Sequence, residues 1–166
     1  MSPAAAPLPD RLGGAPDGKR SLRLWLRLLT CSTTIEQTIS QRLRDEFGST
    51  LPRFDMLSAL DRAGDAGLTM GEAAGMLMVS NGNVTGLVDR LVETGHLARR
   101  PVPNDGRARV ISLTALGRAE FRAMAAEHET WIAEMFADLT PREIADLLRL
   151  LAKTKRSASG GTRGRP

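Results

Sequence analysis

Cysteine, histidine and aromatic residues are scarce in this chain of 166 residues. A single cysteine excludes an internal disulfide. Because the chain has no tyrosine, two tryptophans and four phenylalanines, we expect a core of Leu, Val, Ile, Ala and Met side chains. No run reaches the roughly 18 apolar residues of a membrane-spanning helix, and the N-terminus lacks the basic and then apolar segments of a secretory signal. We therefore expect a cytoplasmic protein with no membrane partner.

The residues that catalytic and metal sites require are also few. The two histidines, His96 and His128, lie far apart in the sequence. His128-Glu129 begins like the zinc-binding HExxH motif, but Ile132 stands where the second histidine would be. The sequence has no nucleophile elbow, phosphate-binding loop or CxxC motif. We therefore expect no enzyme, no metal and no cofactor, and we expect both histidines at the surface or at an interface.

The net charge of +4 is unevenly distributed along the chain. Residues 152–166 hold five basic and no acidic side chains, and residues 1–20 hold three basic and two acidic ones. Residues 21–151 are left with 15 basic and 17 acidic side chains. Overall charge is thus weak evidence for a nucleic-acid partner, and any such affinity has to come from local patches.

Residues 68–94 carry the pattern of two short helices joined by a turn. Thr69 and Glu72 have the spacing of a capping box, in which each side chain bonds a backbone N–H at a helix start. Ser80 is a suitable N-cap for the second helix. Apolar residues then recur at intervals of 3, 4 and 7 in both helices, which gives each one apolar face. These residues are Met70, Ala73, Ala74 and Leu77, and then Val84, Leu87, Val88 and Leu91.

The other side of the second helix is short and polar. Amides and hydroxyls there both donate and accept hydrogen bonds, and glycines allow a close approach to base edges. The N–H groups at the start of a helix also favour a nearby phosphate. The side consists of Asn81, Gly82, Thr85 and Asp89, flanked by Asn83, Gly86 and Arg90.

A basic β-hairpin is predicted after this helix. Gly95 is a suitable C-cap, and residues 98–102 and 109–113 read as strands joined by an Asn-Asp-Gly turn. Helix, helix and hairpin in this order predict a winged helix-turn-helix; the alternative is a helical subdomain with a solvated charged hairpin. The hairpin carries a basic patch of Arg99, Arg100, Arg107 and Arg109.

Long helices flank this unit on both sides. The apolar pattern predicts helices over 21–48, 114–139 and 140–156, the last with a capping box at Thr140 and Glu143. A helix of 27 or so residues is about 40 Å long, which is more than the core of so small a domain covers. A second subunit would cover the remaining apolar stripe.

Residues 80–91 (SNGNVTGLVDRL), the following ETGHLARR and the segment NDGRARVISLT resemble the MarR family of bacterial transcription regulators. The resemblance spans residues 22–155. Its most specific part is Asp105-x-Arg107 followed by Leu113-Thr114. It implies that Arg107 enters the DNA minor groove, that Asp105 steadies it, and that the helix from 81 lies in the major groove. Gly86 departs from the arginine of many relatives, which puts one backbone contact in doubt.

These observations predict a mainly α fold with a small β-hairpin wing and long N- and C-terminal dimerisation helices. We expect a disordered arm at 1–20, a MarR-type domain at 21–156 and a disordered basic tail at 157–166. Within the domain, 51–114 form the winged helix-turn-helix, and 21–48 and 114–156 the dimerisation helices. The resemblance implies a homodimer that binds double-stranded DNA at a pseudo-palindromic operator. The expected DNA-binding residues are Ser80, Asn81, Asn83, Thr85, Arg90, Asp105, Arg107 and Arg109.

The resemblance also implies a repressor that is released by a small effector, an aromatic acid or an aryl thioester. A cleft between the dimer helices and the winged unit would hold it, with an arginine meeting a carboxylate. The candidate lining residues are Trp25, Arg53, Phe54 and Met56, and core packing is the competing interpretation for Trp25 and Phe54.

Three other functions stay open at this point. The first is redox sensing through Cys31, although its apolar surroundings favour a buried and inert thiol. The second is a helical module that binds protein rather than DNA. The third is an enzyme acting on aromatic compounds, which the lack of a convergent acid, base or metal set disfavours.

Overall fold

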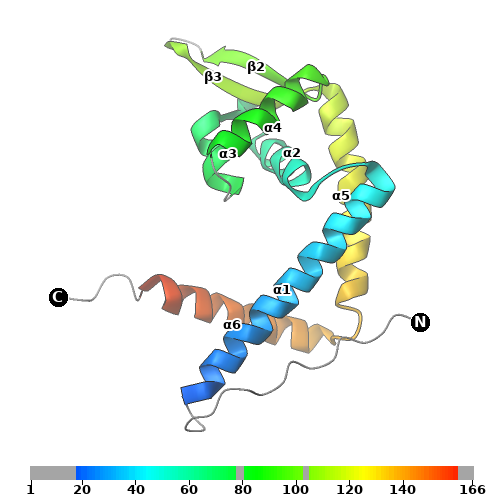
Figure 1. Cartoon of the computed structure of the whole chain (residues 1–166), viewed down its shortest axis with the longest axis vertical. Coiled ribbons are helices and arrows are strands. Elements are labelled where there is room, and N and C mark those ends of the chain that lie inside the picture. Colours follow the sequence, from blue (N-terminus) through cyan, green and yellow to red (C-terminus); the bar gives the residue numbers. More distant parts are fainter. Residues whose placement is uncertain (1–17, 78–80, 103–104, 161–166) are drawn as a thin grey trace, which may run out of the picture.

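The computed structural model describes residues 18–77, 81–102 and 105–160, and gives the backbone alone for residues 77, 81–83, 102 and 105–108. Six α-helices, one 3-10 turn and three short strands follow one another in the described chain (Figure 1). Their bounds are α1 (Gly18–Phe47), α2 (Leu51–Ala63), η1 (Gly64–Ala66), β1 (Leu68–Thr69), α3 (Met70–Leu77), α4 (Asn81–Glu93), β2 (Leu97–Val102), β3 (Asp105–Leu113), α5 (Ala115–Met135) and α6 (Pro141–Gly160).

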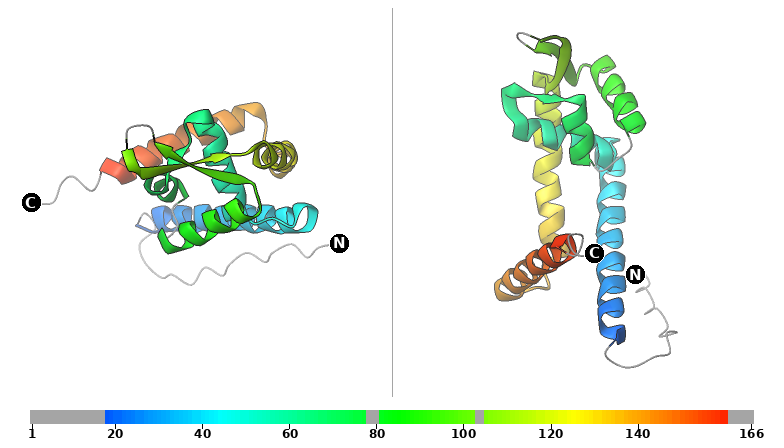
Figure 2. Two further views of the ribbon diagram at one scale, coloured as in Figure 1. Left: turned by 90° about the horizontal axis from the view of Figure 1, so that it is seen from above. Right: turned by 90° about the vertical axis from the view of Figure 1, so that its left-hand side faces the viewer.

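The molecule has two regions, which we call the head and the stalk. The head comprises α2 to β3, and the stalk comprises α1, α5 and α6. α1 and α5 run side by side away from the head, and α6 lies at their far end (Figure 2). This arrangement confirms the predicted fold class, a mainly helical chain with a winged helix-turn-helix between long flanking helices.

Local side-chain caps start several of these helices, as predicted. Thr69 and Glu72 form a reciprocal capping box, with the Thr69 N–H donating to Glu72 Oε2 over 2.7 Å. Thr140 and Glu143 repeat it at the start of α6, at 2.8 Å. These backbone hydrogen bonds favour the carboxylate form, so the pKa of each glutamate is lowered.

The main core lies where the second half of α1, α2, α4 and α5 meet the sheet. Side chains with almost no exposed surface come from each of these elements, and they are aliphatic or Met, as the composition predicted. The largest are Leu43, Met56, Leu57, Leu60, Leu91, Ile111 and Met124. Trp131 on α5 closes the stalk side of this core against Phe47, with ring centroids 6.2 Å apart.

The sheet has three antiparallel strands in the order β1-β3-β2. Leu97 pairs with Leu113 and Arg100 with Val110, so the predicted hairpin is present. The short β1 is an addition that the sequence pattern did not predict, and it pairs Leu68 with Ile111. Gly67 precedes it at φ 71°, and a Cβ there would lie 2.5 Å from the Ile111 carbonyl oxygen. A side chain at this position would therefore push β1 away from β3.

Three helix ends differ from the prediction. α1 begins at Gly18, within the segment 1–20 that was expected to be a disordered arm. α5 ends at Met135 rather than near residue 139. α6 continues to Gly160, four residues into the predicted tail. Residues 1–17 and 161–166 lie outside the described chain.

Much of the stalk is apolar but uncovered. Within α6, which is described in full, no side chain is buried. Exposed large apolar side chains on α1 and α6 are Leu22, Leu24, Trp25, Leu26, Leu29, Ile144, Leu147, Leu148, Leu150 and Leu151. Across the described residues, no helix is long and apolar enough to cross a membrane.

Candidate nucleic-acid interface

The interface is built around α4, which lies at the surface of the head beside the hairpin (Figure 1). Its inner face is anchored by Val84, Val88 and Leu91, none of which is more than 1% exposed. Thr85 and Arg90 are exposed on its other side. The amphipathic pattern therefore orients α4 as predicted, with its polar side available to a partner.

The first turn of α4 contains Asn81 and Asn83, whose backbone is helical. Both residues therefore lie at the N-terminal end of α4, in the turn before Thr85. Ser80, the predicted N-cap, lies outside the described residues.

The hairpin extends beyond the rest of the head as a wing. β2 and β3 pair regularly up to Pro101 and Arg109, after which a register shift brings Val102 opposite Asp105. Asp105 and Arg107 belong to β3 near the tip. Arg109 is exposed at the last regular pair. The wing and the polar side of α4 both belong to the head.

Two arginines of the predicted basic patch have partners within the chain. Arg99 forms an ion pair with Asp89 of α4. Arg100 donates a hydrogen bond to the backbone carbonyl of Asp65 in η1. These contacts connect the wing to the helix beside it and to the turn beneath it.

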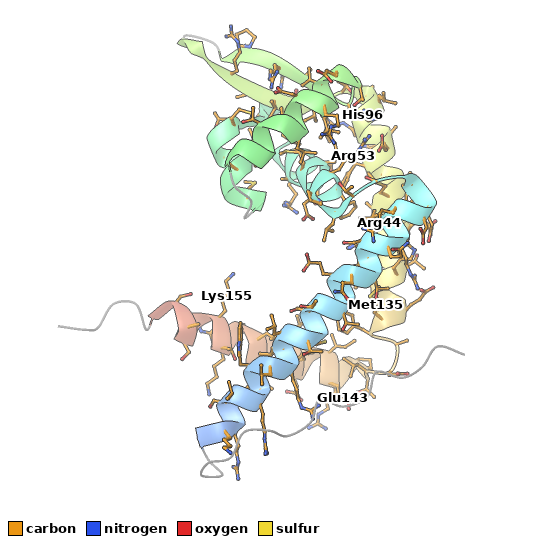
Figure 3. All side chains as sticks on the ribbon, viewed as in Figure 1. Arg44, Arg53, His96, Met135, Glu143 and Lys155 are labelled. Carbon is orange, nitrogen blue, oxygen red and sulfur yellow. The ribbon has the colours of Figure 1, made fainter. Side chains whose placement is uncertain are left out.

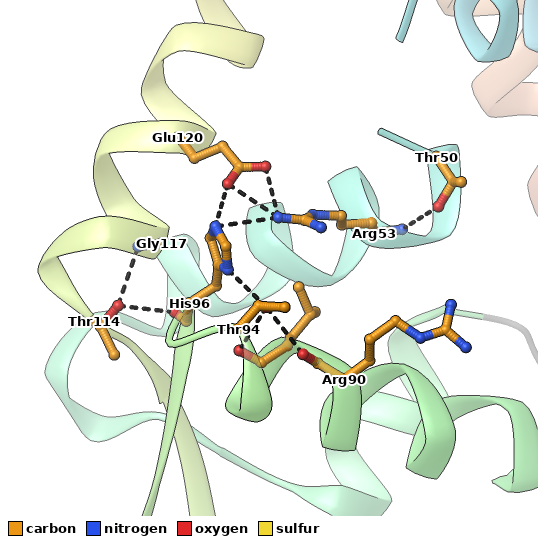
Figure 4. Close-up of polar contacts among 9 residues, drawn as sticks. Thr50, Arg53, Arg90, Thr94, His96, Thr114, Gly117 and Glu120 are labelled. Carbon is orange, nitrogen blue, oxygen red and sulfur yellow. Dashed lines mark hydrogen bonds and ion pairs between the residues drawn. The ribbon is translucent and has the colours of Figure 1, made fainter. Parts of the chain in front are cut away.

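A polar cluster that the sequence did not predict lies behind α4 (Figures 3 and 4). Arg53 of α2 donates through Nη2 to both carboxylate oxygens of Glu120 on α5, at 2.8 and 3.0 Å. His96 forms an ion pair with the same carboxylate through Nε2. Its Nδ1 lies 2.8 Å from the Thr94 hydroxyl at the end of α4. We call Arg53, Thr94, His96 and Glu120 the His96 cluster.

The backbone of His96 is fixed as well. Its N–H donates to the carbonyl of Leu91, and its own carbonyl accepts from Thr114. The Thr114 hydroxyl accepts the N–H of Gly117 at 3.1 Å. A Cβ at residue 117 would lie 2.1 Å from the His96 carbonyl oxygen, so only glycine allows α5 to approach this closely.

Comparisons with known proteins agree with this geometry. A family model described as MarR family matches residues 47–108. The transcriptional activatory protein BadR of Rhodopseudomonas palustris is 32% identical over 143 residues, which cover 84% of this chain and 81% of BadR. The chain belongs to the MarR family.

Solved structures support the same assignment. A MarR family transcriptional regulator from Silicibacter pomeroyi has a TM-score of 0.73 at 28% identity, covering 87% of this chain and 99% of the other. A mutant MarR from E. coli in complex with operator DNA has a TM-score of 0.70 at 26% identity, covering 84% and 99%. The homologues are transcriptional regulators and not enzymes, so the enzyme alternative is not favoured.

The candidate effector residues of this MarR-family chain do not form one site. Met56 is fully buried and Phe54 is 7% exposed, with its ring 4.8 Å from His128 and 5.7 Å from Phe121 between centroids. Trp25 is 57% exposed on the uncovered half of α1. Phe54 therefore follows its competing interpretation, core packing, and the helical position of Met56 turns it into the same core.

Arg53 of this regulator has a partner that sequence spacing could not reveal. Glu120 is 67 residues away, and it accepts two hydrogen bonds from the Arg53 Nη2. The Arg53 Nε is buried and has no hydrogen-bond partner among the described residues.

One prediction about a single residue is wrong for the isolated chain. Cys31 is exposed rather than buried, because the apolar residues near it lie on the same uncovered half of α1. Both histidines are partly exposed: the His96 side chain is 12% exposed, and His128 packs between Phe54 and Trp131. A place for either at an interface stays a prediction. Burial lowers the pKa of His128, and the nearby Asp55 carboxylate partly offsets this.

Proposed function

We propose that this MarR-family regulator is a homodimer that binds a pseudo-palindromic DNA operator. The observation that carries the proposal is the exposed polar side of α4 in the same head as an arginine-bearing wing. The similar mutant MarR of E. coli, whose structure is a complex with operator DNA, supports DNA as the partner. Two-fold symmetry would set the two α4 helices about one DNA turn, roughly 34 Å, apart.

In the proposed complex, α4 lies in the major groove. Asn81, Asn83 and Thr85 contact base edges with their amide and hydroxyl groups. Ser80 and Arg90 contact backbone phosphates and set the register.

The wing completes the contact. Arg107 enters the minor groove, steadied by Asp105, and Arg109 adds attraction to the phosphates.

A second copy of the chain is the proposed cover for the apolar sides of α1 and α6. Leu148 is 64% exposed and Trp25 57%, and a soluble monomer rarely exposes a large contiguous apolar surface. Leu147, Leu148 and Leu151 lie on α6 at the 3 and 4 spacing that presents one side of a helix to a partner. Dimerisation would bury this side and place both heads on a common frame.

Footprinting of the protein on the DNA upstream of its own gene would first locate the operator. Fluorescence anisotropy then measures binding to this operator and to random DNA of equal length. Arg107→Ala should weaken operator binding by about fivefold or more, and Asn83→Ala should narrow the ratio of operator to random affinity. Arg122→Ala removes the same charge from an exposed site on α5 and serves as the control. Operator affinity unchanged in both test variants would refute the assigned roles. Affinity that does not fall with rising salt would favour the protein-interaction alternative.

We propose repression as the regulatory outcome, through a dimer that occupies the promoter. Activation is the second candidate, because the relative BadR is a transcriptional activatory protein by name. In-vitro transcription from the native promoter, with and without the protein, distinguishes the two by the sign of the change.

The proposed effector is an aromatic acid or an aryl thioester. The support within the chain is Arg53, which lies near the junction of head and stalk and retains a buried Nε without a partner in the described part. A carboxylate is the ligand that a guanidinium binds best. Titrating a preformed operator complex with aromatic acids and their thioesters should release the DNA at a saturable concentration, whereas aliphatic acids of equal charge should not.

The redox alternative has its own test. If the Cys31→Ser variant and the parent release DNA to the same extent after peroxide treatment, Cys31 is not a redox sensor.

A further inference from the structure

The C-terminal end of α4 is held by polar contacts to two other helices. The Thr94 hydroxyl donates to the carbonyl of Arg90 at 2.9 Å, within the last turn of α4. His96 joins Thr94 to Glu120 on α5, and Glu120 joins Arg53 on α2 (Figure 4). The cluster thus connects the helix proposed to read DNA with α2 and with a stalk helix.

Hydrogen-bond chemistry defines the direction of these contacts. Because the Thr94 hydroxyl uses its proton on the Arg90 carbonyl, it accepts from the His96 Nδ1–H. The other ring nitrogen, Nε2, lies 3.2 Å from Arg53 Nη2 and against the Glu120 carboxylate. His96 therefore joins Thr94 to both of these neighbours.

The rest of α4 is held mainly by apolar contacts. Val84, Val88 and Leu91 pack into the core, and such contacts are non-directional. Polar contacts are directional, and those of α4 include the ion pair of Asp89 with Arg99 of the wing and the His96 cluster, which acts at the end of α4 opposite to Asn81. A helix of 13 residues is about 20 Å long, so a tilt of about 5° at one end moves the other by roughly 1.7 Å. That displacement is more than half the length of a hydrogen bond.

We propose that Thr94, His96, Glu120 and Arg53 are positioning residues that set the tilt of α4 and hence the discrimination of operator from random DNA. None of the four contacts DNA in this proposal. The proposal rests on the proposed function of α4. It predicts that weakening the cluster lowers specific affinity, whereas non-specific affinity, which depends on phosphate contacts, stays the same.

The test uses matched variants of the full chain at Thr94. Thr94→Val keeps the shape and removes the hydroxyl, whereas Thr94→Ser keeps the hydroxyl and removes the methyl. We expect Thr94→Val to lose about tenfold in operator affinity, to change less than about twofold on random DNA, and to keep its dimer state and circular dichroism. Thr94→Ser should bind both DNAs like the parent. Glu120→Gln, which removes the charge at constant shape, should behave like Thr94→Val.

Several outcomes would overturn the proposal. Parental operator affinity in both Thr94→Val and Glu120→Gln would show that the cluster does not position α4. An equal loss on operator and random DNA would indicate general damage to the head. A loss in Thr94→Ser as large as in Thr94→Val would assign the effect to the methyl group.

A measurement without DNA separates this proposal from the proposed function. In proton NMR, the His96 Nδ1–H should exchange slowly with water in the parent and in Thr94→Ser, and the signal should disappear in Thr94→Val. If the parent lacks this slowly exchanging proton, the cluster is not formed and the positioning role fails, whatever the protein binds. If the proton is present but the parent does not prefer operator over random DNA, the proposed function fails and the positioning role fails with it.

Discussion

The head and the stalk satisfy their side chains in different ways. In the head, α2 and α4 bury their apolar sides within the chain, and Leu60 and Val88 have no exposed surface. In the stalk, α6 has a strong apolar stripe that nothing in the described chain covers. A helix of this pattern depends on packing rather than on propensity for its stability. The contrast indicates that the head folds on contacts within the chain, which include the second half of α1 and α5, whereas α6 and the first half of α1 leave apolar surface for the proposed partner.

The polar contacts of α6 differ from those of the head, although Arg42 of α1 pairs with Glu134 of α5 at 2.6 Å in the rest of the stalk. The head and its junction with α5 contain ion pairs between residues far apart in the sequence, such as Arg118 with Asp61 at 3.3 Å and Arg53 with Glu120 at 2.8 Å. On α6 the pair that is found, Arg149 with Asp146, lies within one turn. Long-range pairs specify how elements are placed, and local pairs only support a helix. The geometry of the head is therefore set inside one chain, and that of the proposed dimer would be set by contacts with the second copy.

The largest expected effect compares a head leucine with a stalk leucine. Leu60→Ala empties a fully buried site and should lower the free energy of unfolding by about 2–5 kcal/mol. Leu148→Ala truncates a side chain that is 64% exposed in the single chain, so its effect should depend on protein concentration, because dimer stability follows mass action. Chemical denaturation at several concentrations measures both. A concentration-independent loss at Leu148 would contradict the division between head and stalk.

The next effect concerns the stalk alone. Leu147→Lys with Leu148→Lys should place two charges in the proposed dimer contact and produce monomers in sedimentation experiments. Losing the second half-site should lower operator affinity roughly 100-fold or more, while a single head keeps its random-DNA affinity. The control is Lys153→Ala, an exposed position on the same helix. A dimeric double variant would place the contact elsewhere.

The smallest effect concerns pH at the junction of the two regions. Burial lowers the pKa of His128 from 6.5, so the unfolded chain binds the proton more readily, and stability falls as pH drops below about 6.5. His128→Gln should reduce this loss, which denaturation at pH 7.5 and 5.5 would measure. Burial is the main cause that raises the pKa of Asp55 from 3.8. At lower pH this carboxyl therefore makes the free energy of unfolding rise, rather than fall, as the pH drops. If the His128→Gln variant loses as much stability between pH 7.5 and 5.5 as the parent does, other groups cause the loss.

Local features of the sequence predicted local structure well. The capping boxes at Thr69 and Thr140 act over three residues, so their geometry follows from spacing alone. The apolar intervals of α4 likewise fixed its inner side, because a helix has a constant period. Sequence patterns did not separate effector residues from core residues as clearly: Phe54 packs in the core, as its competing interpretation had it, and Met56 is fully buried as well.

The amino-acid sequence by itself determined where most helices begin, which sides of them are apolar, and which family the chain resembles, because caps and periodicity are properties of short segments. Only the tertiary structure decided that Arg53, His96 and Glu120 meet behind α4, that β1 joins the sheet, and that Arg99 pairs with Asp89. These contacts join residues between 10 and 67 positions apart. Whether such residues meet depends on the packing angles of whole helices and strands, which short-range spacing does not specify.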